Sequence, residues 1–151
     1  MGLVDLAPDD ADLLGFMRGI GWFPGRRVDL TVDLEAWPTC GYSVFDSVQD
    51  FMMECGGLEF EYPRHSAVGG SHSCLLSGEI SSRRIARMLV TQYEERLDRE
   101  LCPIGQSASG NLFLLMASDG STYGGRDRFL AKIDSDGYRA LNAIWNRVGL
   151  V

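Results

Sequence analysis

The chain has 151 residues, a length typical of one domain, and its 45% of hydrophobic residues is enough to fill a core. The formal net charge of -7 disfavours direct binding of nucleic acid, because phosphate binding depends on clustered Lys and Arg. The same acidity suits a basic protein partner, although it can also serve solubility alone.

The first residues have neither the basic start nor the apolar stretch of a signal peptide, and no window approaches a membrane-spanning length. We therefore expect no membrane association. The four cysteines, Cys40, Cys55, Cys74 and Cys102, contain no Cys-x-x-Cys pair that would indicate metal or redox chemistry. We expect free thiols that pack as small hydrophobic residues, which is typical of a reducing, cytoplasmic compartment.

The periodicity predicts a first helix over about residues 9–20, with an acidic cap and an end at Gly21. Residues 28–33 alternate between apolar and polar, which favours a short strand or extended segment. One helical turn is expected over residues 34–37, before Pro38.

The segment Gly21-Trp22-Phe23-Pro24-Gly25-Arg26 places a large aromatic ring between residues that restrict or relax the backbone. Such a segment predicts a rigid connection in which Trp22 fills the edge of the core. It offers no catalytic side chain.

A second helix is predicted over residues 44–55, with a capping-box-like pair at Ser43 and Asp46 and a stop at Gly56-Gly57. Its apolar stripe comprises Val44, Val48, Phe51, Met52 and Cys55. Residues 58–62 then alternate cleanly, which predicts a half-buried strand with Glu59 and Glu61 facing out.

Glycines and serines over residues 63–73 predict a loop, and Ser73–Leu76 could pair as a strand. A third helix is expected over roughly residues 82–101, with Met88 among the residues of its apolar side. Glu94, Glu95 and Asp98 lie on its opposite side.

Residues 102–105 are expected to turn the chain, and residues 111–116 are apolar enough for a central strand. Asp119-Gly120 is a hairpin signal, followed by a short strand over residues 129–133. A last helix should start at Ser135 or Asp136 and bury a stripe of Tyr138, Leu141, Ile144, Trp145 and Val148.

No candidate catalytic or binding motif in the sequence has all the residues that its chemistry requires. Gly105 to Gly110 lacks the Lys and Ser/Thr of a phosphate-binding loop, and the acids at 134–136 lack the later ligands of a calcium loop. His65 and His72, with Cys74 nearby, supply neither a full zinc set nor an oriented nucleophile.

Several segments occur in an order that resembles one known family. They are Gly21-Trp22-x-Pro24-Gly25-Arg26, Cys55-Gly56-Gly57-Leu58, Tyr93-Glu94-Glu95-x-Leu97, Pro103-Ile104-Gly105, Asp119-Gly120-Ser121-Thr122-Tyr123 and a closing amphipathic helix. Over about residues 10–148, the chain resembles the SUKH superfamily of immunity proteins, specifically its third immunity subgroup.

The resemblance implies a single α+β domain over residues 1–151, with a mostly antiparallel sheet packed against helices. It also implies a bacterial protein of a polymorphic toxin system, which binds and neutralises a cognate toxin, often a nuclease, and which is not an enzyme. No catalytic, cofactor or metal residue is carried over, and residues 63–79 inherit no role in recognition. The matched positions should shape the fold, and they are Trp22, Pro24, Gly25, Arg26, Gly56, Gly57, Pro103, Gly105, Asp119, Gly120 and Tyr123.

Acidic residues are the candidates for contact with a basic toxin, because opposite charge speeds association. The candidates are Glu59, Glu61, Glu94, Glu95 and Asp98. Solvation alone is an equally simple role for each of them. The alternative function is a regulatory or scaffold module that uses the same sheet to bind another protein or a small molecule.

Overall fold

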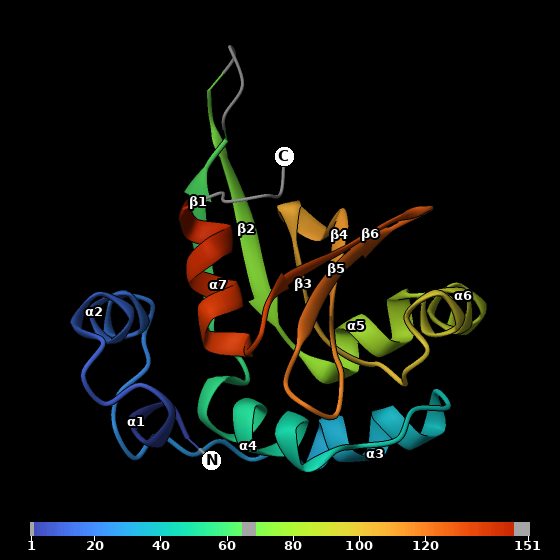
Figure 1. The fold of residues 1–151 in the computed structure, drawn as a ribbon, viewed down its shortest axis with the longest axis horizontal. Coiled ribbons are helices and arrows are strands. Elements are labelled where there is room, and N and C mark those ends of the chain that lie inside the picture. Colours follow the sequence, from blue (N-terminus) through green and yellow to red (C-terminus); the bar gives the residue numbers. More distant parts are fainter. Residues whose placement is uncertain (1, 65–68, 147–151) are drawn as a thin grey trace.

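A six-stranded antiparallel sheet lies at the centre of the fold, with helices packed around it (Figure 1). The structure is a computed structural model that describes residues 2–64 and 69–146. The strands neighbour one another in chain order, so β1 and β6 form the two edges. The strands are β1 (Glu59–Pro63), β2 (Ser71–Leu76), β3 (Cys102–Ser107), β4 (Leu112–Met116), β5 (Thr122–Arg126) and β6 (Phe129–Asp134). The expected α+β class with an antiparallel sheet is confirmed.

Helices cover both faces of this sheet and one of its ends (Figure 1). The helices are α1 (Leu3–Leu6), α2 (Ala11–Gly19), α3 (Thr31–Thr39), α4 (Asp46–Cys55), α5 (Gly78–Arg84), α6 (Arg87–Leu97) and α7 (Gly137–Asn146), and a 3₁₀ turn spans Ala108–Gly110. One face carries α7, which contacts β1 and β6 and has α2 packed beside it. The opposite face carries α5 and α6, while α3 and α4 lie across the lower end in Figure 1.

The clearest periodic segments fold as predicted. The first predicted helix is α2, and the Asp10 carboxylate caps it by accepting a hydrogen bond from the Leu13 amide at 3.0 Å. In β1 the side chains alternate between exposed and buried, with Glu59 and Glu61 exposed. The central strand β4 and the strand β6 also form. Between β4 and β5, Gly120 makes the turn with a φ of +89°.

Three local predictions are wrong. Residues 28–33 form no strand, because α3 already begins at Thr31 and continues through Pro38. The helix expected over residues 82–101 is two helices, separated by an extended backbone at Ile85 and Ala86. Residues 102–105 do not turn the chain but start β3. The pairing of β3 with β4 shifts register at a bulge between Pro103 and Gly105.

Two helix ends also differ from expectation. Helix α4 begins after Phe45 without a side-chain cap, so the Ser43–Asp46 capping pair does not form. Helix α7 is capped by Asp136, whose Oδ1 accepts a hydrogen bond from the Arg139 amide at 2.8 Å. Asp136 is one of the two residues predicted to start this helix. On α7, Trp145 is 41% exposed rather than buried, and Val148 lies outside the described residues. On α6, Met88 is 74% exposed, in contrast to the predicted apolar side.

Candidate partner-binding surface

The 21–26 segment joins α2 to the body of the domain through one ring and one guanidinium. The Trp22 side chain is 2% exposed, and its amide donates to the Met17 carbonyl at 2.9 Å. Arg26 donates from Nη1 to the Glu54 carbonyl and from Nη2 to the Gly56 carbonyl at 3.0 Å. A cation on the last carbonyls of a helix satisfies groups that the helix itself cannot. Arg26 therefore ties the 21–26 segment to the end of α4.

The Pro103 and Gly105 pair has a packing role in β3. The Pro103 carbonyl accepts a hydrogen bond from Nε1 of the fully buried Trp37 at 2.7 Å. A Cβ at Gly105 would lie 2.5 Å from the Leu75 carbonyl oxygen, so a side chain there would force β2 and β3 apart. These positions hold α3 and the sheet in place and leave no chemical group exposed.

The Asp119 turn is closed by contacts with the chain just after α6. Arg99 Nη1 donates to Asp119 Oδ2 at 3.1 Å and to the Tyr123 hydroxyl at 3.3 Å. Asp119 Oδ1 also accepts from the Ser121 amide at 2.9 Å, and these bonds keep the pKa of Asp119 below its ordinary value, against the opposing effect of burial. The group orders a turn, which accounts for Asp119 and Tyr123 without a catalytic role.

The five acidic candidates do not come together. Glu59 and Glu61 lie on the edge strand β1, whereas Glu94, Glu95 and Asp98 lie on or just after α6. In Figure 1, β1 lies at the left edge of the sheet and α6 lies at the far right of the molecule. Glu59 and Glu61 are therefore separated from the three acids of the α6 region by the width of the sheet.

Glu94 is occupied by contacts inside the molecule. Its Oε1 pairs with Arg87 Nη1 at 2.9 Å, and its Oε2 accepts from the Leu101 amide at 2.9 Å. The Arg87 guanidinium also lies 4.6 Å from the centroid of the Tyr42 ring and donates to the Gly41 carbonyl. Burial raises the pKa of Tyr42 to about 12, with Arg87 acting in the opposite direction. Glu94 thus ties α6 to the chain that follows α3 and to the start of β3.

The remaining α6 acids lie in a region of mixed charge. Glu95 and Asp98 are exposed, but Arg96 and Arg99 occupy the same short stretch of chain. Asp98 adopts a left-handed conformation with a φ of +54° and ends the helix. Alternating charges of this kind produce only a weak net field at a distance.

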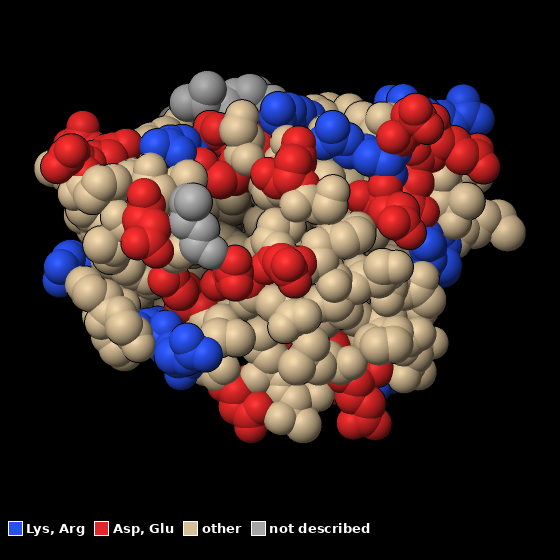
Figure 2. Space-filling model, turned by 60° about the horizontal axis from the view of Figure 1, so that its bottom comes forward, with Lys and Arg blue, Asp and Glu red and all other residues tan. Residues whose placement is uncertain are grey.

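A different acidic segment contains no cation at all. Residues 28–63 include eight carboxylates and no Lys, Arg or His, and they form α3, α4 and β1. Figure 2 shows acidic side chains on the face that α3 and α4 contribute, beside a broad area without charge. The sequence prediction did not include this segment because it considered each acidic residue separately. The absence of Lys, Arg and His over 36 residues is the sequence signal that identifies it.

Seven of the eight carboxylates of this segment divide into a group bonded within the molecule and an outward group. Glu54 Oε1 accepts from the Leu3 amide at 3.0 Å and from the Tyr138 hydroxyl at 2.8 Å, and Asp33 accepts from the Glu79 amide at 2.8 Å. Asp29 accepts from the Thr31 amide and hydroxyl, which lowers its pKa. The outward group is exposed and forms no hydrogen bond or ion pair through its carboxylates within the part of the chain described: Glu35, Asp46, Glu59 and Glu61.

Exposed apolar side chains accompany these acids on α3. Val32 is 55% exposed and Leu34 is 41% exposed, in a helix whose buried side is occupied by Ala36 and Trp37. Protein interfaces typically combine such apolar contacts with a charged rim. We call the exposed residues Val32, Leu34, Glu35, Asp46, Glu59 and Glu61 of this cation-free segment the acidic surface; the set extends over α3, the start of α4 and the edge strand β1.

The described residues show no alternative centre of chemistry. No three His, Cys, Asp or Glu residues among them are placed to hold a metal ion. A shallow hollow of about 510 Å³ lies between α2 and α7, lined by Phe16 and Trp145 and with Asp12 as its one ionisable group. His72 packs 5.8 Å from the Tyr62 ring, and His65 lies outside the described residues. No described helix is long and apolar enough to cross a membrane.

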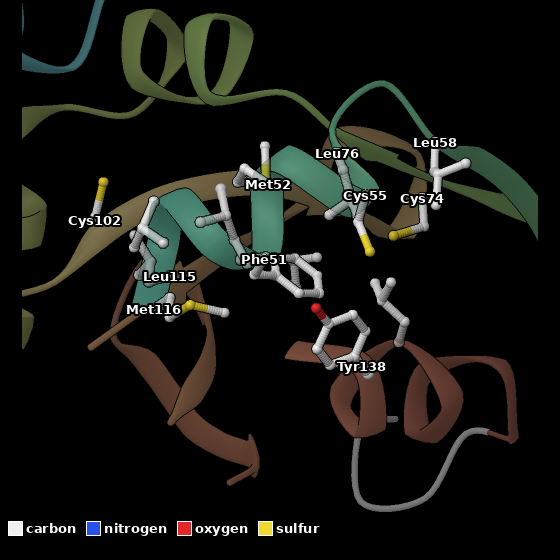
Figure 3. Close-up of a cluster of buried hydrophobic side chains, with 14 of the residues drawn as sticks. Phe51, Met52, Cys55, Leu58, Cys74, Leu76, Cys102, Leu115, Met116 and Tyr138 are labelled. Atoms are coloured by element: carbon white, nitrogen blue, oxygen red, sulfur yellow. The ribbon is translucent and has the colours of Figure 1, made fainter. Parts of the chain in front are cut away.

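The cysteines are free, as predicted. Cys55, Cys74 and Cys102 are buried, and Figure 3 shows Cys55 and Cys74 among the apolar side chains between α4 and the sheet. Burial raises the pKa of the Cys74 thiol to about 12, and it raises the pKa values of Cys55 and Cys102 as well. These thiols are therefore protonated packing groups at neutral pH, not nucleophiles.

Comparison with known proteins identifies the family of this chain. A family described as SUKH-3 immunity protein matches residues 10–146, which is nearly the whole chain. Searches of the curated proteins and of the solved structures gave no match. The family supports a toxin-neutralising immunity role in general, with a toxin as partner. The chain belongs to the SUKH-3 immunity protein family.

Proposed function

We propose that this protein binds and neutralises one cognate toxin of a bacterial polymorphic toxin system, without catalysing a reaction, in the cytoplasm. The observation that carries the partner's chemistry is the cation-free segment 28–63, whose outward carboxylates form the acidic surface. A basic face on the toxin would be drawn to this surface over a distance comparable to the Debye length, about 8 Å at physiological ionic strength.

A toxin that cleaves nucleic acid fits this requirement. Such an enzyme must hold phosphates with clustered Lys and Arg, so it carries a basic face beside its active site. An acidic protein seated there would block the substrate and neutralise the charge that attracts it. We therefore propose a nuclease as the toxin. The immunity protein itself would not bind nucleic acid, because its own acidic surface repels phosphate.

The test uses the toxin encoded next to this chain, made with its catalytic residue inactivated. Association is followed by stopped-flow fluorescence at low and physiological salt. Replacing Glu35→Gln with Asp46→Asn should lower the association rate constant several-fold and flatten its salt dependence, because exposed charges act mainly on association. The matched control is Glu95→Gln with Asp98→Asn, which removes the same charge from the mixed-charge region.

Two outcomes would contradict the proposal. Equal losses for the control and the acidic-surface variant would show that only net charge matters. A wild-type association rate that does not depend on salt would show that the partner face is not basic. Co-expression completes the test, since the wild-type chain should rescue growth from the active toxin and co-purify with the inactive one.

A further inference from the structure

The edge strand β1 has backbone groups that point away from the sheet at two consecutive exposed positions. The Arg64 amide donates to the Gly70 carbonyl at 2.9 Å, and the Leu76 amide donates to the Leu58 carbonyl at 2.9 Å. In an antiparallel pair the residues that bond the neighbour alternate along the strand. The even-numbered residues of β1 therefore bond β2, while the N–H and C=O groups of Glu59 and Glu61 point to the open side.

These outward groups have no partner within residues 2–64 and 69–146. Neither the Glu59 amide nor the Glu61 amide donates a hydrogen bond there. Pro63 occupies the next outward position and has no N–H to offer. An edge with unpaired backbone groups is a template for an added strand.

The side chains of the same two residues lie on the sheet face opposite α7. The register sets Glu59 beside Leu75 and Glu61 beside Ser73 on β2, so neither carboxylate has a charged neighbour across the strand pair. Farther along this face, α5 and α6 cover the sheet: Arg84 lies 5.8 Å from the Phe113 ring, and Tyr93 packs on Gly125. Helix cover is thus found over β3 to β5.

Charge decides which chain can occupy this edge. A second copy pairing edge to edge would bring Glu59 and Glu61 against the same two acids, and like charges directly opposite one another are destabilising. A strand with basic side chains at alternate positions would instead place both of them opposite carboxylates, about 5 Å apart at Cβ. The same edge therefore repels itself and attracts a basic extended segment.

We propose that β1 accepts one extended segment of the toxin as an added strand, and that Glu59 and Glu61 select a segment with Lys or Arg at alternate positions. This inference rests on the proposed function and specifies how part of the acidic surface makes contact. Backbone hydrogen bonds would supply the docking geometry. The two carboxylates would supply the choice of sequence.

The test separates backbone pairing from charge by substitution at one position. Glu61→Gln removes the charge and keeps the N–H, whereas Glu61→Pro removes both. Because the Glu61 N–H points outward, proline there breaks no bond within the sheet, and Pro63 already occupies the equivalent outward position in this strand. Circular dichroism and a urea midpoint unchanged from the Gln variant would establish that the Pro variant is folded.

The probe is a seven-residue peptide in which lysine alternates with valine, titrated into ¹⁵N-labelled protein. We expect shifts at the Glu59 and Glu61 amides, with a dissociation constant near 1 mM as an order of magnitude. Glu61→Gln should weaken binding about two- to fivefold, a typical effect for one exposed cross-strand charge pair. Glu61→Pro should abolish it. An isomeric peptide with its lysines in one run should bind more weakly.

Several results would overturn the inference: no binding of the alternating peptide, equal binding of the two peptides, or a Pro variant that binds as well as the Gln variant. The same pair of variants is then measured against the inactivated toxin. If that complex depends on Glu35 and Asp46 but is indifferent to Glu61→Pro, strand addition is wrong while the proposed function stands. If no acidic-surface variant affects the complex, the basic-partner proposal is wrong.

Discussion

Trp37 of α3 packs directly against Gly78 of α5, and this contact gives a quantitative prediction. Trp37 is fully buried and donates from Nε1 to the Pro103 carbonyl. A Cβ at Gly78 would lie 2.5 Å from Cε2 of Trp37, well inside the van der Waals limit. Glycine at position 78 is therefore required by the ring, because its own backbone conformation is an ordinary one.

The single substitutions should each destabilise the fold. Gly78→Ala forces a methyl group against the fixed indole, which costs about 1–3 kcal/mol, offset by up to about 1 kcal/mol of helix propensity. Trp37→Leu loses much of a buried ring and leaves the Pro103 carbonyl without its donor, for a total of about 3–5 kcal/mol. In the double variant the added methyl group enters the space that the indole has left.

We therefore expect Gly78→Ala to be neutral or stabilising when Trp37 is already leucine. The coupling free energy should be about 2 kcal/mol in the direction of rescue. Urea unfolding measures it through far-UV circular dichroism and the fluorescence of Trp22 and Trp145, which remain. Additivity within about 0.5 kcal/mol would refute direct contact as the reason for glycine at this position.

Three further predictions concern the capping arginine and the thiols. Arg26→Met should lower the free energy of unfolding by about 2–3 kcal/mol through loss of two charge-assisted bonds, while Arg27→Met, its exposed neighbour, should change it by less than about 0.5 kcal/mol; similar effects would contradict the capping role. Ellman's reagent should modify the partly exposed Cys40 quickly and the three buried thiols only on unfolding, so a second fast thiol in the native protein would refute the packing. Burial raises the pKa of the Cys74 thiol from 9.0 to about 12. The contribution of the protonated thiol to the free energy of unfolding is therefore complete below pH 9 and falls as the pH rises toward 12. Unfolding free energy should fall between about pH 9 and pH 11 at up to about 1.4 kcal/mol per pH unit for this thiol, and less steeply in Cys74→Ala; equal slopes would contradict it.

Periodic segments were predictable because their burial follows their own sequence. In α4 and β1 the apolar spacing determines which side faces the core, and Gly57 supplies the left-handed turn between them with a φ of +82°. The strand β4 is apolar enough to be identified by composition alone. In these elements local preference and tertiary packing agree.

Other elements depend on contacts that the local sequence does not show. The break between α5 and α6 contains no Gly or Pro, and it allows Ile85 to enter the core with 5% exposure. In β3, Pro103 and Gly105 suggest a turn, yet each meets a demand from outside the strand: a carbonyl for Trp37 and room for β2. Tertiary packing overrides local preference at both places.

The candidate surface was only partly predictable. Glu59 and Glu61 were recognised because strand alternation sends them outward, but Glu94 looks equivalent in sequence and is held by Arg87 and the Leu101 amide. The contributions of Glu35 and Asp46 follow from a property of the whole segment 28–63, the absence of cations, and not from any motif around either residue.

The most direct test of the central claim is the association rate of this protein with its neighbouring toxin, measured over a range of salt concentrations. We predict a rate that falls steeply as salt rises, with a shallower fall when Glu35, Asp46, Glu59 and Glu61 are neutralised together and no such change when Glu95 and Asp98 are. A rate that is insensitive to salt, or one whose salt dependence survives loss of all four charges, would contradict recognition through this surface.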